Sequence, residues 1–259
     1  MQRILMPGVA GLKSIRPIVM ATAYDYTQAK LIDGVVDAIL IGDSLGMVMA
    51  GLGSTLEVTL DQMIYHCQMV SRGAKTSMLI GDLPFLSYQI NPEEALRSAG
   101  RMIQEGHVQS VKLEGGLEVV AQIQKIVSVG IPVVGHLGME PQKLLQYGSY
   151  GKQAKGSEGA SQLLESAFAV EQAGASMLVL ENIPHALAAE VTNRLRIPTI
   201  GIGAGSQTDG QVQVFHDLMG LDPDFSPKHA RVFRQLGEDI RQAAQEYADA
   251  VREGRLDSL

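Results

Sequence analysis

Eight short apolar segments recur along the chain, and most are separated by stretches whose apolar residues are spaced as on one helix face. Each segment is continuously apolar rather than alternating, which is typical of parallel strands covered on both faces. The segments are PIVMATA from Pro17, VDAILIGD from Val36, SMLIGDLP from Ser77, VQSVKLEG from Val108, IPVVGHLG from Ile131, SMLVLEN from Ser176, IPTIGIGAG from Ile197 and QVQVFHD from Gln211. The pattern therefore predicts a repeating β–α unit.

Capping signals mark two of the helices between these segments. Thr59 and Gln62 have the spacing of a capping box. Asn91, Pro92 and Glu94 provide a cap, a first-turn proline and a third-position carboxylate. Glycines at 73 and 106 are expected to end these two helices.

Two further helices complete the expected fold. Apolar spacing predicts one over about 163–174 and a last one from about Lys228 to Glu253. Eight strands with helical crossovers favour a single-domain α/β protein, a (β/α)8 TIM barrel spanning residues 1–259. A doubly wound open sheet is the alternative, but no dinucleotide-binding glycine motif follows the first strand.

Composition and charge exclude several classes of function. The formal net charge is −7, and the 21 basic residues form no block, which argues against nucleic-acid binding. The single cysteine, Cys67, excludes an intrachain disulfide and a cysteine-cluster metal site, so we expect an intracellular, cytoplasmic protein. No segment has the roughly 18 consecutive apolar residues of a membrane-spanning helix. Lys13 and Arg16 interrupt a weak signal-like N-terminus.

Polar residues follow the predicted strands at the end where a barrel has its active site. The second strand ends in Asp43 and Ser44, the third in Asp82, the fourth in Lys112 and Glu114, the fifth in His136, the sixth in Glu181 and Asn182, the seventh in the glycine loop Gly201 to Gly205 and the eighth in His216 and Asp217. One such residue is usually a cap or a loop carboxylate. Their recurrence at successive strand ends predicts an active site.

Three of these carboxylates suggest a metal site. Asp43, Asp82 and Glu114 would supply hard oxygen ligands from three adjacent strands, which suits Mg²⁺ completed by water and substrate oxygens. Lys112 lies two residues from Glu114, so both side chains point to one face of the strand. A salt bridge within the barrel is the alternative role for this lysine.

The remaining candidates are a base and a histidine. Partial burial after the apolar segment SMLVL is expected to raise the pKa of Glu181 and make it a usable base. His136 is either functional or a packed core histidine. A divalent metal, a lysine and a carboxylate base together favour a reaction that stabilises the enolate of an α-keto acid.

Two loops and the cysteine leave alternatives open. The segment from Tyr147 to Gly159 is the longest predicted loop and is either a lid or a mobile surface excursion. The glycine loop after the seventh strand either binds an anion or allows a tight turn. Cys67 falls on an apolar helical face and is a poor candidate nucleophile.

Seven collinear motifs make a resemblance specific. They are TAYDY from Thr22, GDSLGM from Gly42, GDLPF from Gly81, VKLEGG from Val111, GHLG from Gly135, LEN.P from Leu180 and IGIGAG followed by DGQV and HD. Over roughly residues 17–250 the chain resembles the ketopantoate hydroxymethyltransferase family. The resemblance implies a barrel of the phosphoenolpyruvate/pyruvate superfamily. It also implies transfer of a hydroxymethyl group from 5,10-methylenetetrahydrofolate to 3-methyl-2-oxobutanoate (α-ketoisovalerate), giving 2-dehydropantoate in pantothenate biosynthesis.

The resemblance also implies roles for individual residues, a cofactor and an assembly. Asp43 and Asp82 match the family's metal-binding aspartates, with Glu114 completing the environment of one Mg²⁺ per subunit. The keto-acid binding positions are Asp43, Ser44, Asp82, Lys112 and the pocket histidine His136. Glu181 corresponds to the proton acceptor. Family members form decamers, so a homo-oligomer is implied.

The chain departs from the family pattern in three places. The atypical N-terminal segment 1–16 lacks the charged helix that usually precedes the first strand, which puts subunit packing in doubt. Asn182 follows the base where cysteine is common, and Gly151 stands where lysine is common in the loop. These two changes put folate affinity and rate in doubt.

Two rival functions share part of the chemistry. A C–C lyase of the 2-methylisocitrate or oxaloacetate type would share metal and keto-acid binding, but those enzymes have a catalytic cysteine motif that is absent from this sequence. A non-catalytic keto-acid binding protein would have little use for a base at Glu181.

Overall fold

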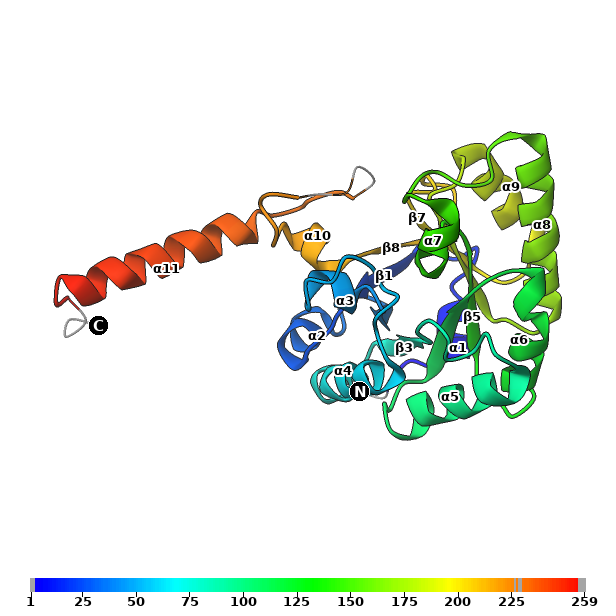
Figure 1. The fold of residues 1–259 in the computed structure, drawn as a ribbon, viewed down its shortest axis with the longest axis horizontal. Helices are drawn as coiled ribbons and strands as arrows, with labels where there is room; N and C mark the ends of the chain where they lie inside the picture. Colours follow the sequence, from blue (N-terminus) through cyan, green and yellow to red (C-terminus); the bar gives the residue numbers. More distant parts are fainter. Residues whose placement is uncertain (1–2, 226, 228–229, 256–259) are drawn as a thin grey trace. The chain divides into compact units, whose positions relative to one another are not determined.

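The structure is a computed structural model that describes residues 3–225, 227 and 230–255. Within these residues eight parallel strands form a closed barrel in sequence order, and helices surround it (Figure 1). The strands are β1 (Ile18–Thr22), β2 (Ala38–Ile41), β3 (Met78–Asp82), β4 (Ser110–Glu114), β5 (Val133–Gly138), β6 (Met177–Glu181), β7 (Thr199–Ile202) and β8 (Gly210–Gln213). The (β/α)8 barrel predicted from the sequence is confirmed. The first seven predicted segments each contain one observed strand, and β8 begins at Gly210, one residue before the eighth segment.

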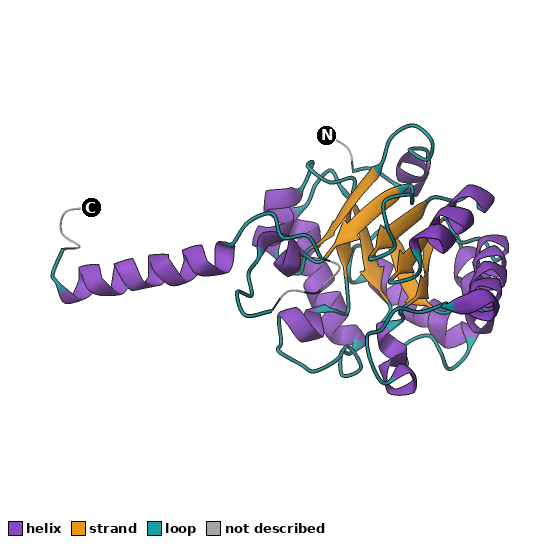
Figure 2. Cartoon of the chain, turned by 90° about the horizontal axis from the view of Figure 1, so that it is seen from above, coloured by secondary structure: helices purple, strands orange, loops and turns teal. Residues whose placement is uncertain are grey.

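Helices cover the outer face of the strands (Figure 2). For example, α4 packs against β2 and β3, α5 against β4, and α8 against β5. Within the first 212 residues the helices are α1 (Met6–Ala10), α2 (Tyr26–Ile32), α3 (Leu45–Val48), α4 (Leu60–Gly73), α5 (Pro92–Gln104), α6 (Val120–Val127), α7 (Leu144–Tyr147), α8 (Gly156–Gln172) and α9 (His185–Arg194), with short 3-10 turns η1 (Leu117–Val119) and η2 (Pro141–Lys143). None of the helices in the described residues is both long and apolar enough to cross a membrane.

The predicted caps are present in the structure. The Thr59 hydroxyl accepts from the Gln62 backbone N–H, and the Gln62 side chain accepts from the Thr59 N–H, so the capping box of α4 is complete. The Asn91 side chain accepts from the Glu94 N–H at the start of α5. The helix predicted over about 163–174 is longer than expected. It is α8, which begins at Gly156, so the loop before it covers only residues 148–155.

The N-terminal segment lies against the end of the barrel at which the strands begin. Met6 and Val9 of α1 are buried in the core cluster formed by the inward-facing residues of the strands. Lys13 Nζ lies 2.6 Å from Asp209 Oδ2, just before β8. Arg16 forms a two-point ion pair with Asp37, just before β2. The atypical segment is therefore part of the fold; residues 1–2 lie outside the described residues.

The chain divides into two compact units, Met1–Val212 and Gln213–Leu259, so the expectation of one domain over residues 1–259 stays a prediction. The second unit contains α10 (Phe215–Met219) and α11 (Leu236–Arg252). His216 and Asp217 were expected to end the eighth strand, but they lie in α10, because the Leu218 N–H bonds back to the Val214 carbonyl in a helical turn.

The last helix also starts later than predicted. Its expected start at Lys228 lies outside the described residues, but residues 230–235 are described and are not helical. Phe233 donates its backbone N–H to the Leu218 carbonyl, and Gly237 donates to the Gly220 carbonyl. In a helix that started near residue 228, these two N–H groups would bond to carbonyls four residues earlier. Because they bond to residues of the preceding segment instead, α11 begins only at Leu236.

Candidate active site

Five of the polar residues predicted at the strand ends lie on the inner face of the barrel, above its apolar core: Asp82, Lys112, Glu114, His136 and Glu181. Residues two apart in a strand share a face. Along β3 and β6 the inward side chains are apolar up to the last residue of the strand, which is the ionisable Asp82 or Glu181. The register pairs Asp82 with Lys112, and Glu114 with His136, across neighbouring strands. Five of the predicted residues are thus held by regular strand geometry.

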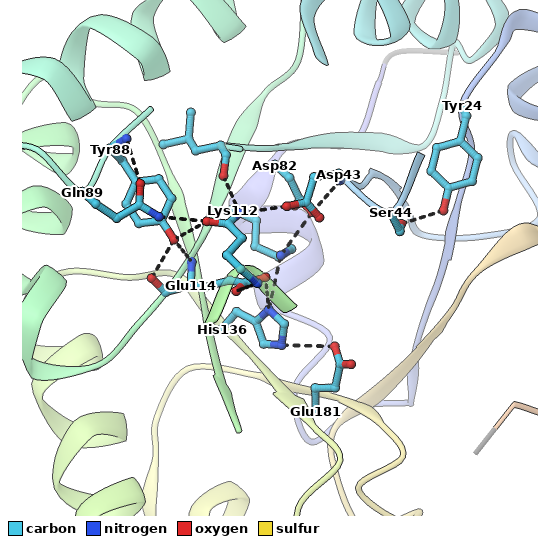
Figure 3. Close-up of polar contacts among 12 residues, drawn as sticks. Tyr24, Asp43, Ser44, Asp82, Tyr88, Gln89, Lys112, Glu114, His136 and Glu181 are labelled. Atoms are coloured by element: carbon cyan, nitrogen blue, oxygen red, sulfur yellow. Dashed lines mark hydrogen bonds and ion pairs between the residues drawn. The ribbon is translucent and has the colours of Figure 1, made fainter. Parts of the chain in front are cut away.

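Lys112 is at the centre of this group (Figure 3). Its Nζ lies 3.2 Å from Asp82 Oδ2 and 3.3 Å from His136 Nδ1, and its side chain is 5% exposed. Burial alone would lower the pKa of Lys112, but Asp82, Glu114 and Asp43 together raise it. Lys112 is therefore a fixed cation facing the barrel mouth. The salt bridge predicted as its alternative role is present too, at the same site.

Asp43 and Asp82 lie together on neighbouring strand ends. The Asp43 backbone N–H donates to Asp82 Oδ2 at 3.2 Å, and both side chains are buried. Burial raises the pKa of Asp82 to about 7, although Lys112 opposes the shift, and burial also raises the pKa of Asp43. Asp82 Oδ1 is buried without a hydrogen-bond partner among the described residues. Two buried carboxylates with an oxygen that lacks a donor fit a divalent cation such as Mg²⁺.

Glu114 is held differently from the two aspartates. Its Oε2 accepts from the Gln142 backbone N–H at 3.0 Å, and its Oε1 lies 3.7 Å from His136 Nδ1. Burial raises the pKa of Glu114 well above its usual range, and the charges of Asp43 and Glu140 add to the increase. Over the described part of the chain, no three His, Cys, Asp or Glu side chains are grouped to hold a metal ion. Of the three predicted metal ligands, Asp43 and Asp82 are therefore in contact with each other, and Glu114 is held separately.

His136 connects Lys112 to Glu181. Its Nδ1 faces the Lys112 ammonium, which can only donate, so Nδ1 must be the accepting nitrogen. Burial and the charge of Lys112 lower the pKa of His136, which favours the neutral ring with its proton on Nε2. That nitrogen lies 3.3 Å from Glu181 Oε2. The histidine is buried, yet its contacts belong to the site rather than to the apolar core.

Glu181 is held close to the end of β5. Met139 donates its backbone N–H to the Glu181 carbonyl at 2.8 Å, and Gly138 has a φ of +107°. A Cβ at Gly138 would collide with that carbonyl, so only glycine permits this approach. The Glu181 side chain is 18% exposed, against 3% for His136. Asp82, Lys112, His136 and Glu181 form a row of contacting side chains, and of its two acidic groups only Glu181 is open to a substrate from solvent.

The two remaining predicted features at the mouth are Ser44 and the loop before α8. The Ser44 hydroxyl lies 2.9 Å from the Tyr24 hydroxyl, directly after Asp43 in the chain. In the loop, the Tyr150 carbonyl accepts from the Asn182 side chain, and the Gln153 N–H donates to the Asn182 carbonyl. Asn182 adopts a φ of +47°, which asparagine tolerates better than most residues. The loop is thus tied to the residue that follows Glu181.

Other expectations resolve more simply. Gly203 and Gly205 have φ values of +63° and +86°, a conformation that glycine adopts readily in tight turns, which favours the tight-turn interpretation of the glycine loop. Cys67 is buried, and burial raises the pKa of its thiol, so it is a poor nucleophile as predicted.

Two residues at the site were missed by the sequence interpretation. Gln142 is buried and contacts Asp43 through its side chain, and Tyr88 contacts the backbone of Glu114. The available signal for Gln142 was Pro141, which starts the short turn η2 directly after β5. Nothing in the local sequence distinguishes Tyr88 from an ordinary core tyrosine.

Comparisons with known proteins agree with the resemblance. The profile of a family described as ketopantoate hydroxymethyltransferase matches residues 7–257. A 3-methyl-2-oxobutanoate hydroxymethyltransferase from Pelobacter propionicus is 48% identical, over 98% of this chain and 94% of the relative. One of the same name from Chloroflexus aggregans is 52% identical, over 92% of this chain and 85% of the relative.

Solved structures support the fold alone. A phosphonopyruvate hydrolase covers 100% of this chain and 90% of its own, with a TM-score of 0.67 and 10% identity. A phosphoenolpyruvate phosphomutase from Streptomyces platensis subsp. rosaceus covers 98% of this chain and 90% of its own, with a TM-score of 0.65 and 13% identity.

Proposed function

The chain belongs to the ketopantoate hydroxymethyltransferase family, and we propose that the polar mouth of its barrel transfers a hydroxymethyl group from 5,10-methylenetetrahydrofolate to 3-methyl-2-oxobutanoate. It is a transferase of pantothenate biosynthesis, and the product is 2-dehydropantoate. The observation that carries the assignment of the site is the continuous polar chain Asp82, Lys112, His136 and Glu181, with contacts of 3.2–3.3 Å.

The keto-acid head is assigned to Asp43, Ser44, Asp82, Lys112 and His136. Asp43 and Asp82 would hold Mg²⁺, with Glu114 as the third carboxylate of its environment. When bound, the ion polarises the carbonyl of the keto acid. Lys112 supports the same end of the substrate, because a buried ammonium stabilises negative charge that develops on the carbonyl oxygen.

Glu181 is assigned as the base that removes the proton from the branched carbon. His136 Nε2 lies 3.3 Å from Glu181 Oε2 and so favours an orientation in which this oxygen faces the histidine. The second oxygen then remains available for the substrate proton. The separation of roles follows from position: Lys112 is at the keto-acid end of the polar chain, and Glu181 is at the end that is open to solvent.

The cellular form of the enzyme is also a proposal. We assign it to the cytoplasm as a homo-oligomer, with a decamer as the specific expectation. Its partners are then two small molecules, the keto acid and the folate. The support is the family match over residues 7–257.

A turnover assay tests the proposed function. Purified protein is incubated with 3-methyl-2-oxobutanoate, Mg²⁺ and 5,10-methylenetetrahydrofolate, and 2-dehydropantoate is measured with and without the folate. Formation of the product only when folate is present supports the proposal. Cleavage of a C–C bond without folate would indicate a lyase, and binding without any conversion would indicate a keto-acid binding protein.

A further inference from the structure

Gln142 is a buried amide at the mouth of the barrel, 5% exposed, and each of its four side-chain hydrogen-bonding positions faces a polar partner. Its Nε2 donates to Asp43 Oδ2 at 2.8 Å and to the Leu83 carbonyl at 3.0 Å. Its Oε1 is the acceptor at 3.0 Å from the Tyr88 hydroxyl and 2.9 Å from Gln89 Nε2. Such an amide has one orientation.

That orientation follows from the chemistry of its partners. The Leu83 carbonyl and the Asp43 carboxylate only accept, so the nitrogen of the amide must face them. A rotated amide would place its oxygen against two acceptors. On the other side, the Tyr88 hydroxyl has one hydrogen for two acceptors, Gln142 Oε1 and the Glu114 carbonyl. Gln89 is therefore the donor that keeps Oε1 satisfied whichever way the Tyr88 hydrogen points.

The backbone of Gln142 fixes a second carboxylate. Its N–H donates to Glu114 Oε2 at 3.0 Å, so one residue holds both Asp43 and Glu114. Pro141 at the start of η2 presets the turn that places Gln142 there, three residues after the buried Met139. The residue thus links the ends of β2, β4 and β5 at one point.

We propose that Gln142 is a positioning residue that holds Asp43 Oδ2, so that Asp43 Oδ1 is the oxygen presented to a divalent cation and the keto acid. The inference rests on the proposed function, in which Asp43 is a metal-binding residue. A carboxylate with one oxygen pinned by a neutral amide loses little freedom when its other oxygen binds. Partners of this kind typically contribute 10- to 100-fold to metal affinity or activity, roughly.

The test uses Gln142→Met, which has nearly the same length but neither donates nor accepts a strong hydrogen bond. Gln122→Met is the matched control, because Gln122 is a buried glutamine on α6, 7% exposed, outside the site. Calorimetric titration with 3-methyl-2-oxobutanoate, at several fixed Mg²⁺ concentrations and without folate, measures binding independently of turnover. We expect binding to weaken by about 10- to 100-fold in Gln142→Met and to be unchanged in the control.

A milder variant protects the test against misfolding. Gln89→Leu leaves Gln142 in place and removes the donor that orients its oxygen, together with a long contact of 3.5 Å from the Tyr88 backbone N–H to Gln89 Oε1. We expect binding to weaken by about 2- to 10-fold with the fold intact, the worth of one hydrogen bond. Unchanged binding in folded Gln142→Met, or in Gln89→Leu if Gln142→Met fails to fold, would overturn the positioning role. Absence of binding in the wild type would instead refute the proposed function.

Discussion

Asp33 is a half-buried carboxylate that joins the end of α2 to the segment leading into β3. Its oxygens accept from the backbone N–H groups of Lys75, Thr76 and Ser77 at 2.8–3.2 Å, and from the Thr76 hydroxyl at 2.9 Å. Burial raises the pKa of Asp33, but these donors outweigh it, and the net result is a fall from 3.8 to about 2. The carboxylate therefore stabilises the folded chain in its ionised form.

The size of this contribution follows from the shift. A fall of the Asp33 pKa from 3.8 to about 2 corresponds to about 2 kcal/mol. Screening by solvent at this partly exposed site reduces the contribution to about 1–2 kcal/mol. Ionised Asp33 stabilises the fold because its pKa is lower in the folded than in the unfolded chain. The stabilisation is fully present above about pH 4, decreases by roughly half near pH 3 and is lost as the pH falls through about 2.

Urea unfolding of the wild type and of Asp33→Asn, measured from pH 7 to pH 3, tests the prediction. We expect the free energy of unfolding to be about 1–2 kcal/mol lower in the variant at pH 7, with the difference narrowing below pH 4. Asp61→Asn is the control, because Asp61 is 81% exposed in its ion pair with Arg101. A difference that stays constant between pH 7 and pH 3 would refute the electrostatic account of Asp33.

Three further predictions concern the metal site, the N-terminal segment and the assembly. Asp43→Ala or Asp82→Ala should abolish Mg²⁺-dependent turnover and weaken keto-acid binding in calorimetry; unchanged affinity in the presence of Mg²⁺ would exclude chelation through these residues. Met6→Ala should lower the free energy of unfolding by about 2–5 kcal/mol, because Met6 is 4% exposed in the barrel core; a loss below about 0.5 kcal/mol, typical of a surface change, would contradict that packing. Light scattering should give a mass near ten times the 27.8 kDa of one chain, and a monomer at micromolar concentration would argue against the decamer.

The barrel was predictable because its signals are local. Continuous apolar strands and the caps at Thr59 and Asn91 are fixed by residues close in sequence, and each was found where expected. The start of the last helix was not, because long-range bonds from Phe233 and Gly237 to the carbonyls of Leu218 and Gly220 override the local helical pattern.

In the candidate site, too, features set by nearby residues could be predicted and features set by long-range contacts could not. Lys112 and Glu114 were predicted to share a face from their spacing, and the structure confirms it, with Lys112 beside Asp82 across the register. Gln142 could not be predicted, because its importance depends on bonds to residues 59 and 99 positions away in sequence. A residue such as Gln142, which acts by orienting another side chain, has no sequence motif that identifies it.

The central claim is that Glu181 removes the proton from the branched carbon of the keto acid. Exchange of that proton for deuterium, followed by NMR in the presence of Mg²⁺ and without folate, measures this step alone. Glu181→Gln keeps the size of the side chain and removes its basicity, so we expect 3-methyl-2-oxobutanoate still to bind while exchange falls by about 100-fold or more. Exchange as fast as in the wild type would contradict the account and would make His136, 3.3 Å away, the next candidate.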